Sequence, residues 1–595
     1  MTLTLNSFHL HAITIAVGIG MNPFWSYPAQ AQTELAQVAE PPSTEPLPEP
    51  DAPRPLPPPE ELLRPPEPSD ESPETVPGEV PDTILVERFQ VEGSTIFNPD
   101  LLAEVAKRAV IETPAAPAEV DGSDPMINQS LSFAQLLQAR SAVTQYYTDR
   151  GYITSGAFIP PQVLDSGVVI IQVIEGRLED IDVSVEGRLI PGYVRSRLRR
   201  FSRPPLNVDR LLEGLQLLQL DPLVQTISAE LAAGARPGTS ILDVDVVQAD
   251  AFDVDIVLDN GRSPSVGSFR RGVQATHANL LGLGDELSVG YRNTDGSDTL
   301  DLSYTMPVNP RNGTVAFSYG TTDSEVIEDP FNFLDIQSES RFYEFTVRQP
   351  VIETPTRELA LSLTASRRES ESEFLEEILG EPIPFPSMGA DEEGRTRISA
   401  LRFAQEWTQQ GRRQVIAARS QFSIGFDAFN STINENGPDS RFFAWRGQAQ
   451  WVRLLAPDTL LLVRGDLQLA DGPLVPLEQF GLGGQQTVRA YRQDELLTDN
   501  GLLFSTEARL PLVRARRIDG IFQIAPFIDV GRGWNLDAPD PDPATLAALG
   551  VGLLWQQGDR LSIRLDYGLP LVDVDRDGDS LQENGFYFSV TYTPF

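Results

Sequence analysis

The C-terminal part of the chain, residues 251–595, alternates apolar and polar positions with a period of two, and residues typical of turns interrupt the alternation. This period predicts β-strands that present one apolar and one polar face. We count sixteen such segments, at residues 251–259, 266–277, 285–293, 297–305, 312–320, 338–348, 356–366, 396–407, 412–426, 441–453, 459–469, 501–511, 519–531, 547–555, 559–567 and 584–594.

The connections between these segments alternate in length. Short connections follow even-numbered segments, at residues 280–284, 306–311, 349–353, 454–458 and 556–558. Long connections follow odd-numbered segments, at residues 321–337, 367–395, 427–440, 470–500, 532–545 and 569–583. Outer-membrane barrels have short periplasmic turns and longer outer loops, and an even strand count returns both ends of the barrel to the periplasm. The pattern predicts a transmembrane barrel of 16 antiparallel strands, because the alternative, a soluble sandwich or propeller, gives no reason for this alternation.

Upstream of the barrel, the order strand–helix–helix–strand–strand occurs twice. The first copy is expected at residues 84–92, 98–105, 133–147, 152–159 and 168–174. The second copy is expected at residues 178–185, 193–201, 207–218, 224–231 and 240–247. A spacing of roughly ninety residues indicates an internal duplication of one α+β unit. Each unit is poor in catalytic side chains, but an exposed strand edge can take up an extended peptide by β-augmentation.

The first 31 residues have features of a secretory signal peptide. Residues 12–20 form a short apolar stretch, and residues 28–31 (PAQA) supply a cleavage pattern. No Lys or Arg precedes the apolar stretch, which departs from the usual signal, and a disordered tail is the alternative. We expect export and removal of residues 1–31.

Residues 32–82 are expected to form a linker. Residues 33–40 can form a short helix, whereas residues 41–82 are dense in proline and acidic residues. Such a composition cannot bury apolar surface and predicts an extended, self-repelling spacer rich in polyproline II. A polyproline II ligand for a peptide-recognition domain is the alternative. Because a sixteen-stranded barrel has a wide lumen, we expect the short helix to plug it at rest.

The composition excludes several classes of protein. The 595 residues include 46 basic and 85 acidic residues, for a net charge of −39, with no cysteine and three histidines. A strongly acidic chain is a poor nucleic-acid binder, and the lack of cysteine removes disulfides and thiol nucleophiles. Once His9 and His11 leave with the signal, His277 is the remaining imidazole, which excludes a multi-histidine zinc site. We therefore expect no enzyme activity and no cofactor, although a carboxylate-based site stays open.

Three motifs near the C-terminal end carry a family resemblance. They are, in chain order, residues 481–484 (GLGG) with Val488, Arg489, Ala490 and Tyr491, then residues 501–507 (GLLFSTE), then Phe527, Ile528 and Asp529 followed by Gly531. They resemble the Gly-Gly…Val-Arg-Gly-Tyr loop, the strand after it and the Phe-x-Asp strand of the TpsB transporters of two-partner secretion. Ala490 stands where that family has glycine, which predicts a tighter or differently turned loop tip. Together with the spacer, the paired units and the barrel, the resemblance covers the whole mature chain.

The resemblance implies a fold, a partner and a location. The fold is an all-β transmembrane barrel (251–595) preceded by two small α+β POTRA-like domains (83–176 and 177–250). The POTRA-like domains lie in the periplasm and recognise an unfolded, β-rich, TpsA-like exoprotein, which the outer-membrane pore translocates to the cell surface. A barrel-assembly or insertion factor of the same superfamily and a solute-conducting porin are the alternatives.

The last residue is expected to direct insertion into the membrane. The final strand alternates apolar residues such as Tyr592 with small polar residues, and the chain ends on Phe595. A terminal Phe is the usual recognition element for the barrel-assembly machinery, although here Phe595 is out of parity with Tyr592 and follows Pro594. The expected partners are therefore this machinery, outer-membrane lipid and the exoprotein, and no nucleic acid.

Strand parity predicts a contact for Arg489. On residues 519–531 the apolar set that includes Ile528 suits lipid, so Asp529 and Phe527 point into the lumen, and Glu507 points inward by the same parity. An arginine carried inward by a glycine-containing loop can pair bidentately with Asp529, with Glu507 nearby, and pin the loop inside the pore. The alternative is that Arg489 faces solvent outside.

Two further motifs resemble ligand-binding loops, and we interpret both as turns. Residues 573–579 begin like an EF-hand loop, but Glu583 lies one residue short of the position that closes such a site. An acidic turn is the default there, and we expect no metal. Residues 281–284 (LGLG) lack the Lys-Ser/Thr of a phosphate-binding loop, and we interpret them as a turn between strands.

Overall fold

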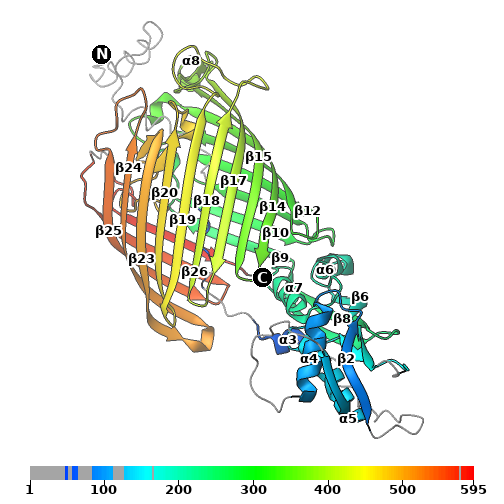
Figure 1. The fold of residues 1–595 in the computed structure, drawn as a ribbon. Helices are drawn as coiled ribbons and strands as arrows, with labels where there is room; N and C mark the ends of the chain where they lie inside the picture. The colour runs from blue at the N-terminus through cyan, green and yellow to red at the C-terminus, as the bar shows by residue number, and fades with distance from the viewer. Residues whose placement is uncertain are drawn as a thin grey trace, which may run out of the picture.

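The computed structural model describes residues 47–50, 52, 57–64, 83–111, 126–163, 167–574 and 578–594. The expected signal peptide (1–31), the helix expected at residues 33–40 and the C-terminal Phe595 lie outside the described residues. The described part consists of a large barrel with two α+β units at one of its ends (Figure 1).

The barrel is closed and antiparallel throughout, and β27 pairs with β9 to complete the ring. The prediction of sixteen strands is confirmed. In order round the ring the strands are β10 (Arg270–Ala278), β11 (Glu286–Asn293), β12 (Ser297–Pro307), β13 (Thr314–Glu325), β14 (Gln337–Thr354), β15 (Arg357–Phe374), β17 (Arg395–Gln410), β18 (Gln414–Gly425), β19 (Phe443–Ala456), β20 (Thr459–Ala470), β23 (Asn500–Ala515), β24 (Gly520–Trp534), β25 (Thr545–Gln557), β26 (Leu561–Pro570), β27 (Phe586–Tyr592) and β9 (Phe252–Asp259).

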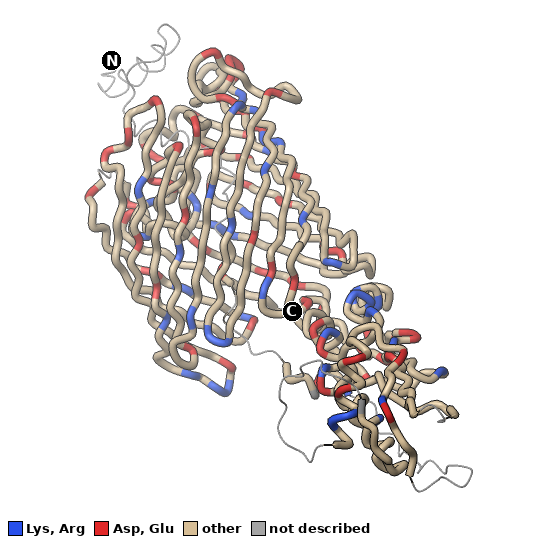
Figure 2. Tube along the Cα trace, viewed as in Figure 1, with Lys and Arg blue, Asp and Glu red and all other residues tan. Residues whose placement is uncertain are grey.

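Side chains alternate between the two faces of the barrel wall. On β24, Phe527 and Asp529 are buried on the lumen side, whereas Ile528 and Val530 are exposed on the outer surface. Glu507 on β23 is buried in the same way. Charged residues occur along the strands and not only at the rims (Figure 2). An apolar outer face suits lipid, and the polar inner face lines a hydrated lumen.

The β14–β15 hairpin is longer than the alternating pattern predicted. The pattern ended at residue 366, whereas the ladder of hydrogen-bonded strands runs on to Glu373, which pairs with Gln337. The added residues are mostly Ser, Arg and Glu, because a ladder that leaves the bilayer needs no lipid-facing side chains. The outer connection is correspondingly shorter, and it contains α8 (Glu376–Leu379) and β16 (Ile383–Pro384) at the end of the barrel away from the α+β units (Figure 1).

The first unit contains one strand that the sequence pattern missed. Its sheet has the order β3-β2-β5-β4. Its elements are β2 (Ile84–Glu92), α4 (Pro99–Ile111), β3 (Met126–Leu131), α5 (Phe133–Thr148), β4 (Gly156–Phe158) and β5 (Val168–Ile174). The additional strand, β3, lies at an edge and is rich in Asn, Gln and Ser, so no apolar alternation marks it. The strand expected at residues 152–159 shortens to β4, because Tyr152 packs edge-on against Phe97 from a turn.

The second unit has the predicted order of elements. These are β6 (Arg177–Glu186), α6 (Pro191–Leu198), α7 (Val208–Gln219), β7 (Val224–Ala233) and β8 (Thr239–Gln248). Asn207 caps α7 by accepting a hydrogen bond from the Arg210 amide at 3.1 Å. The buried face of α7, which includes Leu211 and Leu215, packs on the sheet and forms the core of the unit. No helix in the described part of the chain has the length and apolar composition to cross a membrane.

The prediction that the linker buries no apolar surface is wrong at residues 59–64. A turn of helix, α3 (Pro59–Leu62), leads into a short strand, β1 (Leu63–Arg64), which pairs in parallel with β7 of the second unit. Leu62 and Leu63 are 2% and 6% exposed and belong to that unit's core. Two adjacent leucines form no periodic apolar pattern. Their burial depends on a strand far along the chain, so the local sequence cannot predict it.

The second unit is fastened to the short turns of the barrel. Arg197 Nε donates a hydrogen bond of 2.8 Å to Asn312 Oδ1, in the turn between β12 and β13. Arg200 forms an ion pair with Glu353 at 3.0 Å, at the end of β14. The short turns therefore face the α+β units, which is the periplasmic side that the loop lengths predicted.

Candidate functional site

The connection between β20 and β23, residues 471–499, folds into the barrel, and we call it the lumen loop. It contains a 3-10 turn (Pro476–Glu478) and a small hairpin of β21 (Phe480–Leu482) and β22 (Leu496–Thr498). Gly483 and Gly484 follow β21 with φ angles of +109° and +100°, which glycine adopts readily. These two residues turn the chain so that residues 485–495 lie against the inner wall.

Arg489 lies at the centre of a buried cluster on that wall. Its Nε donates to Asp529 Oδ2 at 2.7 Å, and its Nη2 donates to Asp529 Oδ1 at 2.9 Å. Its Nη1 donates to Glu507 Oε2 at 2.7 Å. Arg489 is 5% exposed, Glu507 is 6% exposed and Asp529 is fully buried. The planar guanidinium thus uses a bidentate contact to one carboxylate and a third bond to the other, a geometry that a lysine cannot reproduce.

The neighbours of Arg489 in the motif hold the loop by other contacts. The Phe527 ring lies under the guanidinium, whose carbon is 3.4 Å from the ring centroid. Val488 and Tyr491 are buried in an apolar cluster between the lumen loop and the wall. The Tyr491 hydroxyl lies 2.8 Å from the carbonyl oxygen of Ala547 on β25. Residues of the Val-Arg-Ala-Tyr motif therefore contact β24 and β25, and Arg489 also contacts β23.

Ala490 occupies a conformation that favours glycine. Its φ is +83°, in the left-handed region, where a residue with a side chain is strained. Ala490 also lies directly against Gly568 of β26, where an added Cβ would come within 2.7 Å of the Cβ of Ala490. The methyl group of Ala490 is thus held between the loop tip and the barrel wall. The loop tip has a positive φ at Ala490, and the missing side chain of Gly568 leaves room for the methyl group.

Glu507 is shared by several arginines. Arg564 on β26 donates to Glu507 Oε2 at 2.5 Å, and Arg509 donates to Glu507 Oε1 at 2.8 Å. Arg564 also pairs with Asp566 at 2.6 Å. The three carboxylates and three arginines of this patch form one network, so each buried charge has an opposite charge beside it. Sequence reasoning identified Arg489, Glu507 and Asp529 but missed Arg564 and Asp566, because no motif marks them.

A second anchor of the lumen loop was missed entirely. Glu478 accepts hydrogen bonds from Arg402 Nη2 at 2.6 Å and from Arg368 Nη1 at 3.1 Å. The two arginines lie on β17 and β15, which β18, β19 and β20 separate from β23. The loop is therefore tied to two distant parts of the wall, at Glu478 and at Arg489. A lone glutamate in a loop carries no signal until its partners are known.

The linker also reaches the lumen wall. Glu49 forms a bidentate ion pair with Arg509 on β23, with both distances 2.8 Å. The backbone carbonyl of Leu47 accepts a hydrogen bond from the side chain of Gln450 on β19. A segment that lies before the periplasmic units in sequence thus contacts the interior of the barrel.

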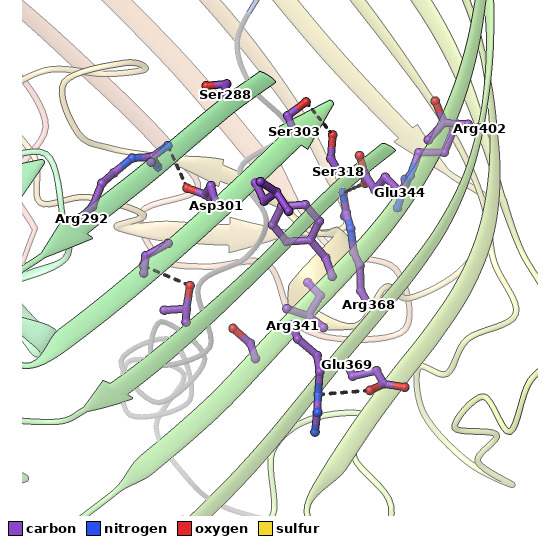
Figure 3. A pocket seen from close by; sticks show the side chains of 18 of the residues that line it. Ser288, Arg292, Asp301, Ser303, Ser318, Arg341, Glu344, Arg368, Glu369 and Arg402 are labelled. Atoms are coloured by element: carbon purple, nitrogen blue, oxygen red, sulfur yellow. Dashed lines mark hydrogen bonds and ion pairs between the residues drawn. The ribbon is translucent and has the colours of Figure 1, made fainter. Parts of the chain in front are cut away.

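A polar cavity of about 480 Å³ lies beside the lumen loop. Its wall carries hydroxyl groups and charges of both signs (Figure 3). The ion pairs drawn there are Arg292–Asp301 (3.0 Å), Arg341–Glu369 (3.3 Å) and Arg368–Glu344 (3.2 Å). The lining is therefore polar and carries charges of both signs.

The acidic turn near the C-terminus is only partly described. Residues 575–577 lie outside the described residues. Glu583 accepts a hydrogen bond from the Ser580 amide at 2.8 Å. Within the part of the chain that the structure describes, no three His, Asp or Glu side chains are grouped so as to hold a metal ion. Residues 281–284 form the turn between β10 and β11.

Comparisons with known proteins agree with this architecture. Outer membrane transporter CdiB of Escherichia coli O6:K15:H31 (strain 536 / UPEC) is 25% identical over 516 residues, which cover 85% of this chain and 82% of that protein. Heme/hemopexin transporter protein HuxB of Haemophilus influenzae (strain 86-028NP) is 21% identical over 500 residues, which cover 78% of this chain and 82% of that protein. The solved structure of CdiB from Escherichia coli aligns with a TM-score of 0.62 at 19% identity over 100% of both chains, so the fold is shared.

Two family models match the chain. The model of the POTRA domain, ShlB-type, matches residues 116–176, within the first unit. The model described as haemolysin secretion/activation protein ShlB/FhaC/HecB matches residues 238–554, more than half of the chain. The protein is therefore an outer-membrane transporter that belongs to the ShlB/FhaC/HecB family of haemolysin secretion/activation proteins.

Proposed function

We propose that this protein is the transporter of a two-partner secretion pair and translocates an unfolded, β-rich, TpsA-like exoprotein through its barrel to the cell surface. The two α+β units, as POTRA domains, capture the exoprotein in the periplasm. Outer-membrane lipid surrounds the barrel, and the barrel-assembly machinery recognises the terminal Phe595 during insertion. The protein acts by transport and not by catalysis.

The observation that carries the proposal is the attachment of the second unit to the mouth of the barrel. The contacts Arg197–Asn312 and Arg200–Glu353 hold this unit beside the short turns. An extended segment bound to the unit's sheet is thereby presented next to a polar lumen. A lining of hydroxyls and mixed charges gives a passing polypeptide no strong binding site of one sign, which favours movement over retention.

We assign the Arg489 cluster a positioning role in this transport. The two anchors at Arg489 and Glu478 hold the lumen loop across the barrel at rest. Passage of a polypeptide then requires the loop to shift while the hydrogen-bonded wall stays intact. Folding of the exoprotein outside the cell supplies the driving force.

Two other functions predict different behaviour. A porin has no use for periplasmic units, the second of which is fastened here to the barrel by Arg197 and Arg200. A barrel-insertion factor would alter the amounts of other outer-membrane proteins. A gene for a large secreted repeat protein beside the gene for this chain would favour the secretion function over both.

The test is co-expression with the exoprotein that such a neighbouring gene encodes. The full chain should release it into the medium, and deletion of either α+β unit should retain it in the periplasm. Heat-modifiable migration of the barrel on gels should stay unchanged, which shows that insertion is intact. Normal release by a barrel of residues 251–595 alone would disprove the capture role.

A further inference from the structure

The sheet of the second unit is completed by a segment of the linker. Its strand order is β1-β7-β8-β6, with β1 at one edge. Leu63 pairs with Ala229 and Arg64 pairs with Glu230, in parallel register. Leu62 adds a second buried side chain from the end of α3. Residues 59–64 thus bind β7 as an added strand, the mode by which sheets take up extended peptides.

Backbone groups on the outer edge of β7 form hydrogen bonds with two short substitutes for a neighbouring strand. β1 covers only two of its ten residues. Farther along the edge, the side-chain amide of Gln219 takes the place of a peptide group. It donates to Gln225 O at 3.0 Å and accepts from Ile227 N at 3.1 Å. Both substitutes are short and local, so a longer strand could replace them and pair along more of β7.

Residues 59–64, which occupy this edge, indicate what kind of peptide segment binds there. Leu62 and Leu63 enter the apolar layer between α7 and β7, whereas Glu61 and Arg64 stay exposed. The site therefore selects an extended segment with two consecutive apolar residues and tolerates charge on either side. Unfolded chains of β-rich proteins offer such segments repeatedly.

We propose that the β7 edge is a binding site for an extended apolar segment of the exoprotein and that residues 59–64 occupy it as a tethered competitor at rest. This proposal rests on the proposed function. The tether gives the linker segment a high effective concentration, which keeps weak ligands out. An exoprotein segment displaces it by forming more backbone hydrogen bonds with β7. Displacement frees the linker, whose upstream residues contact the lumen wall at Glu49.

The first test is a peptide-binding measurement on the purified full chain in detergent. The probe is a fluorescent peptide with the sequence of residues 57–64 (PPPEELLR). The variant Leu62→Asp/Leu63→Asp should bind it at least about tenfold more tightly than the unaltered chain, because its own segment no longer competes. The matched control Glu61→Gln, at an exposed neighbouring position, should bind like the unaltered chain. Equal binding by all three proteins, or no binding by any, would overturn the proposal.

The second test locks the linker in place. The chain has no cysteine, and Arg64 and Glu230 are paired and both exposed. Neighbouring strands lie about 4.8 Å apart, within the Cα separation that a disulfide spans. Arg64→Cys/Glu230→Cys should therefore form a disulfide in the oxidising periplasm and reduce exoprotein release at least about tenfold, with recovery on adding a reductant. Each single cysteine variant serves as the control.

The outcomes of the two tests separate this proposal from the proposed function. Unchanged release by the oxidised double variant would reject displacement even if secretion itself is normal. Absence of release by the unaltered chain would reject the proposed function, and the peptide measurement would still decide whether the β7 edge binds extended segments.

Discussion

At the scale of single residues, Arg489 concentrates the interactions of the lumen loop. Its side chain makes three hydrogen bonds to two buried carboxylates and stacks on Phe527. Removal of one partner of a buried pair leaves an uncompensated charge, at a cost of about 3–5 kcal/mol when burial is complete and less where lumen water reaches it. Arg464 and Arg564 lie near Asp529 and Glu507 and limit this penalty after loss of Arg489.

We predict that Arg489→Ala and Asp529→Ala each impair secretion far more than folding, because the barrel wall does not depend on one loop. The double variant should be little worse than either single variant, since each change removes the same interaction between Arg489 and Asp529. Arg489→Lys should not restore secretion, because lysine lacks the planar fork. Secretion is measured as exoprotein in the medium, and folding as heat-modifiable migration. Additive defects in the double variant would count against a shared interaction.

At the scale of elements, the lumen loop is attached to the barrel wall at two points. Arg489 ties it to β23 and β24, while Glu478 ties it to Arg368 and Arg402 on β15 and β17. Glu478 is 6% exposed in its side chain, so it stands between two guanidinium groups with little water. Each end limits the movement of the other because the chain between them is short and contains β21, which pairs with β22.

We predict that Glu478→Gln weakens only the attachment of the lumen loop to β15 and β17. The amide removes the charge that compensates two buried arginines, so the β21–β22 hairpin should open more often. Hydrogen exchange measured by mass spectrometry should be faster in residues 471–499 and unchanged in β18 to β20. The control is Asp471→Asn, an exposed carboxylate in the same loop that accepts a hydrogen bond from Phe443 N. No change in exchange would mean that the Arg489 end holds the loop without help.

At the scale of the whole molecule, two segments from distant parts of the chain share the lumen. The lumen loop occupies one region, and the linker contacts the wall through Glu49 and Arg509. The same linker contributes β1 to the second unit, so one short stretch connects the interior of the barrel with the periplasmic sheet.

We predict that deletion of residues 32–52 raises single-channel conductance in planar bilayers, as expected if the segment around Glu49 fills part of the pore. The deletion stops before residue 57, so that α3 and β1 stay in place. Arg509→Gln should raise conductance by a smaller amount, because it removes one ion pair and leaves the segment. Arg514→Gln, which removes an exposed ion pair with Asp458, should change nothing. Unchanged conductance after the deletion would exclude a plug formed by this segment.

The sequence by itself determined the features that depend on local pattern. A period of two predicted the sixteen strands and which face of each meets lipid, because lipid and lumen impose opposite polarities on alternate residues. The same parity placed Asp529 and Glu507 on the inner face, and the lengths of the connections predicted which end faces the periplasm. Each of these constraints acts on neighbouring residues and therefore leaves a trace in the sequence.

Only the tertiary structure decided the contacts between distant segments. The burial of Leu62 and Leu63 on β7, the anchor at Glu478 and the ion pair of Glu49 each depend on residues far along the chain, and no spacing rule relates them. The β14–β15 hairpin runs past its alternating pattern because backbone hydrogen bonds and polar cross-strand contacts such as Ser338–Ser372 sustain it without apolar side chains. Ala490 takes a glycine-like conformation because packing against Gly568 outweighs its local preference.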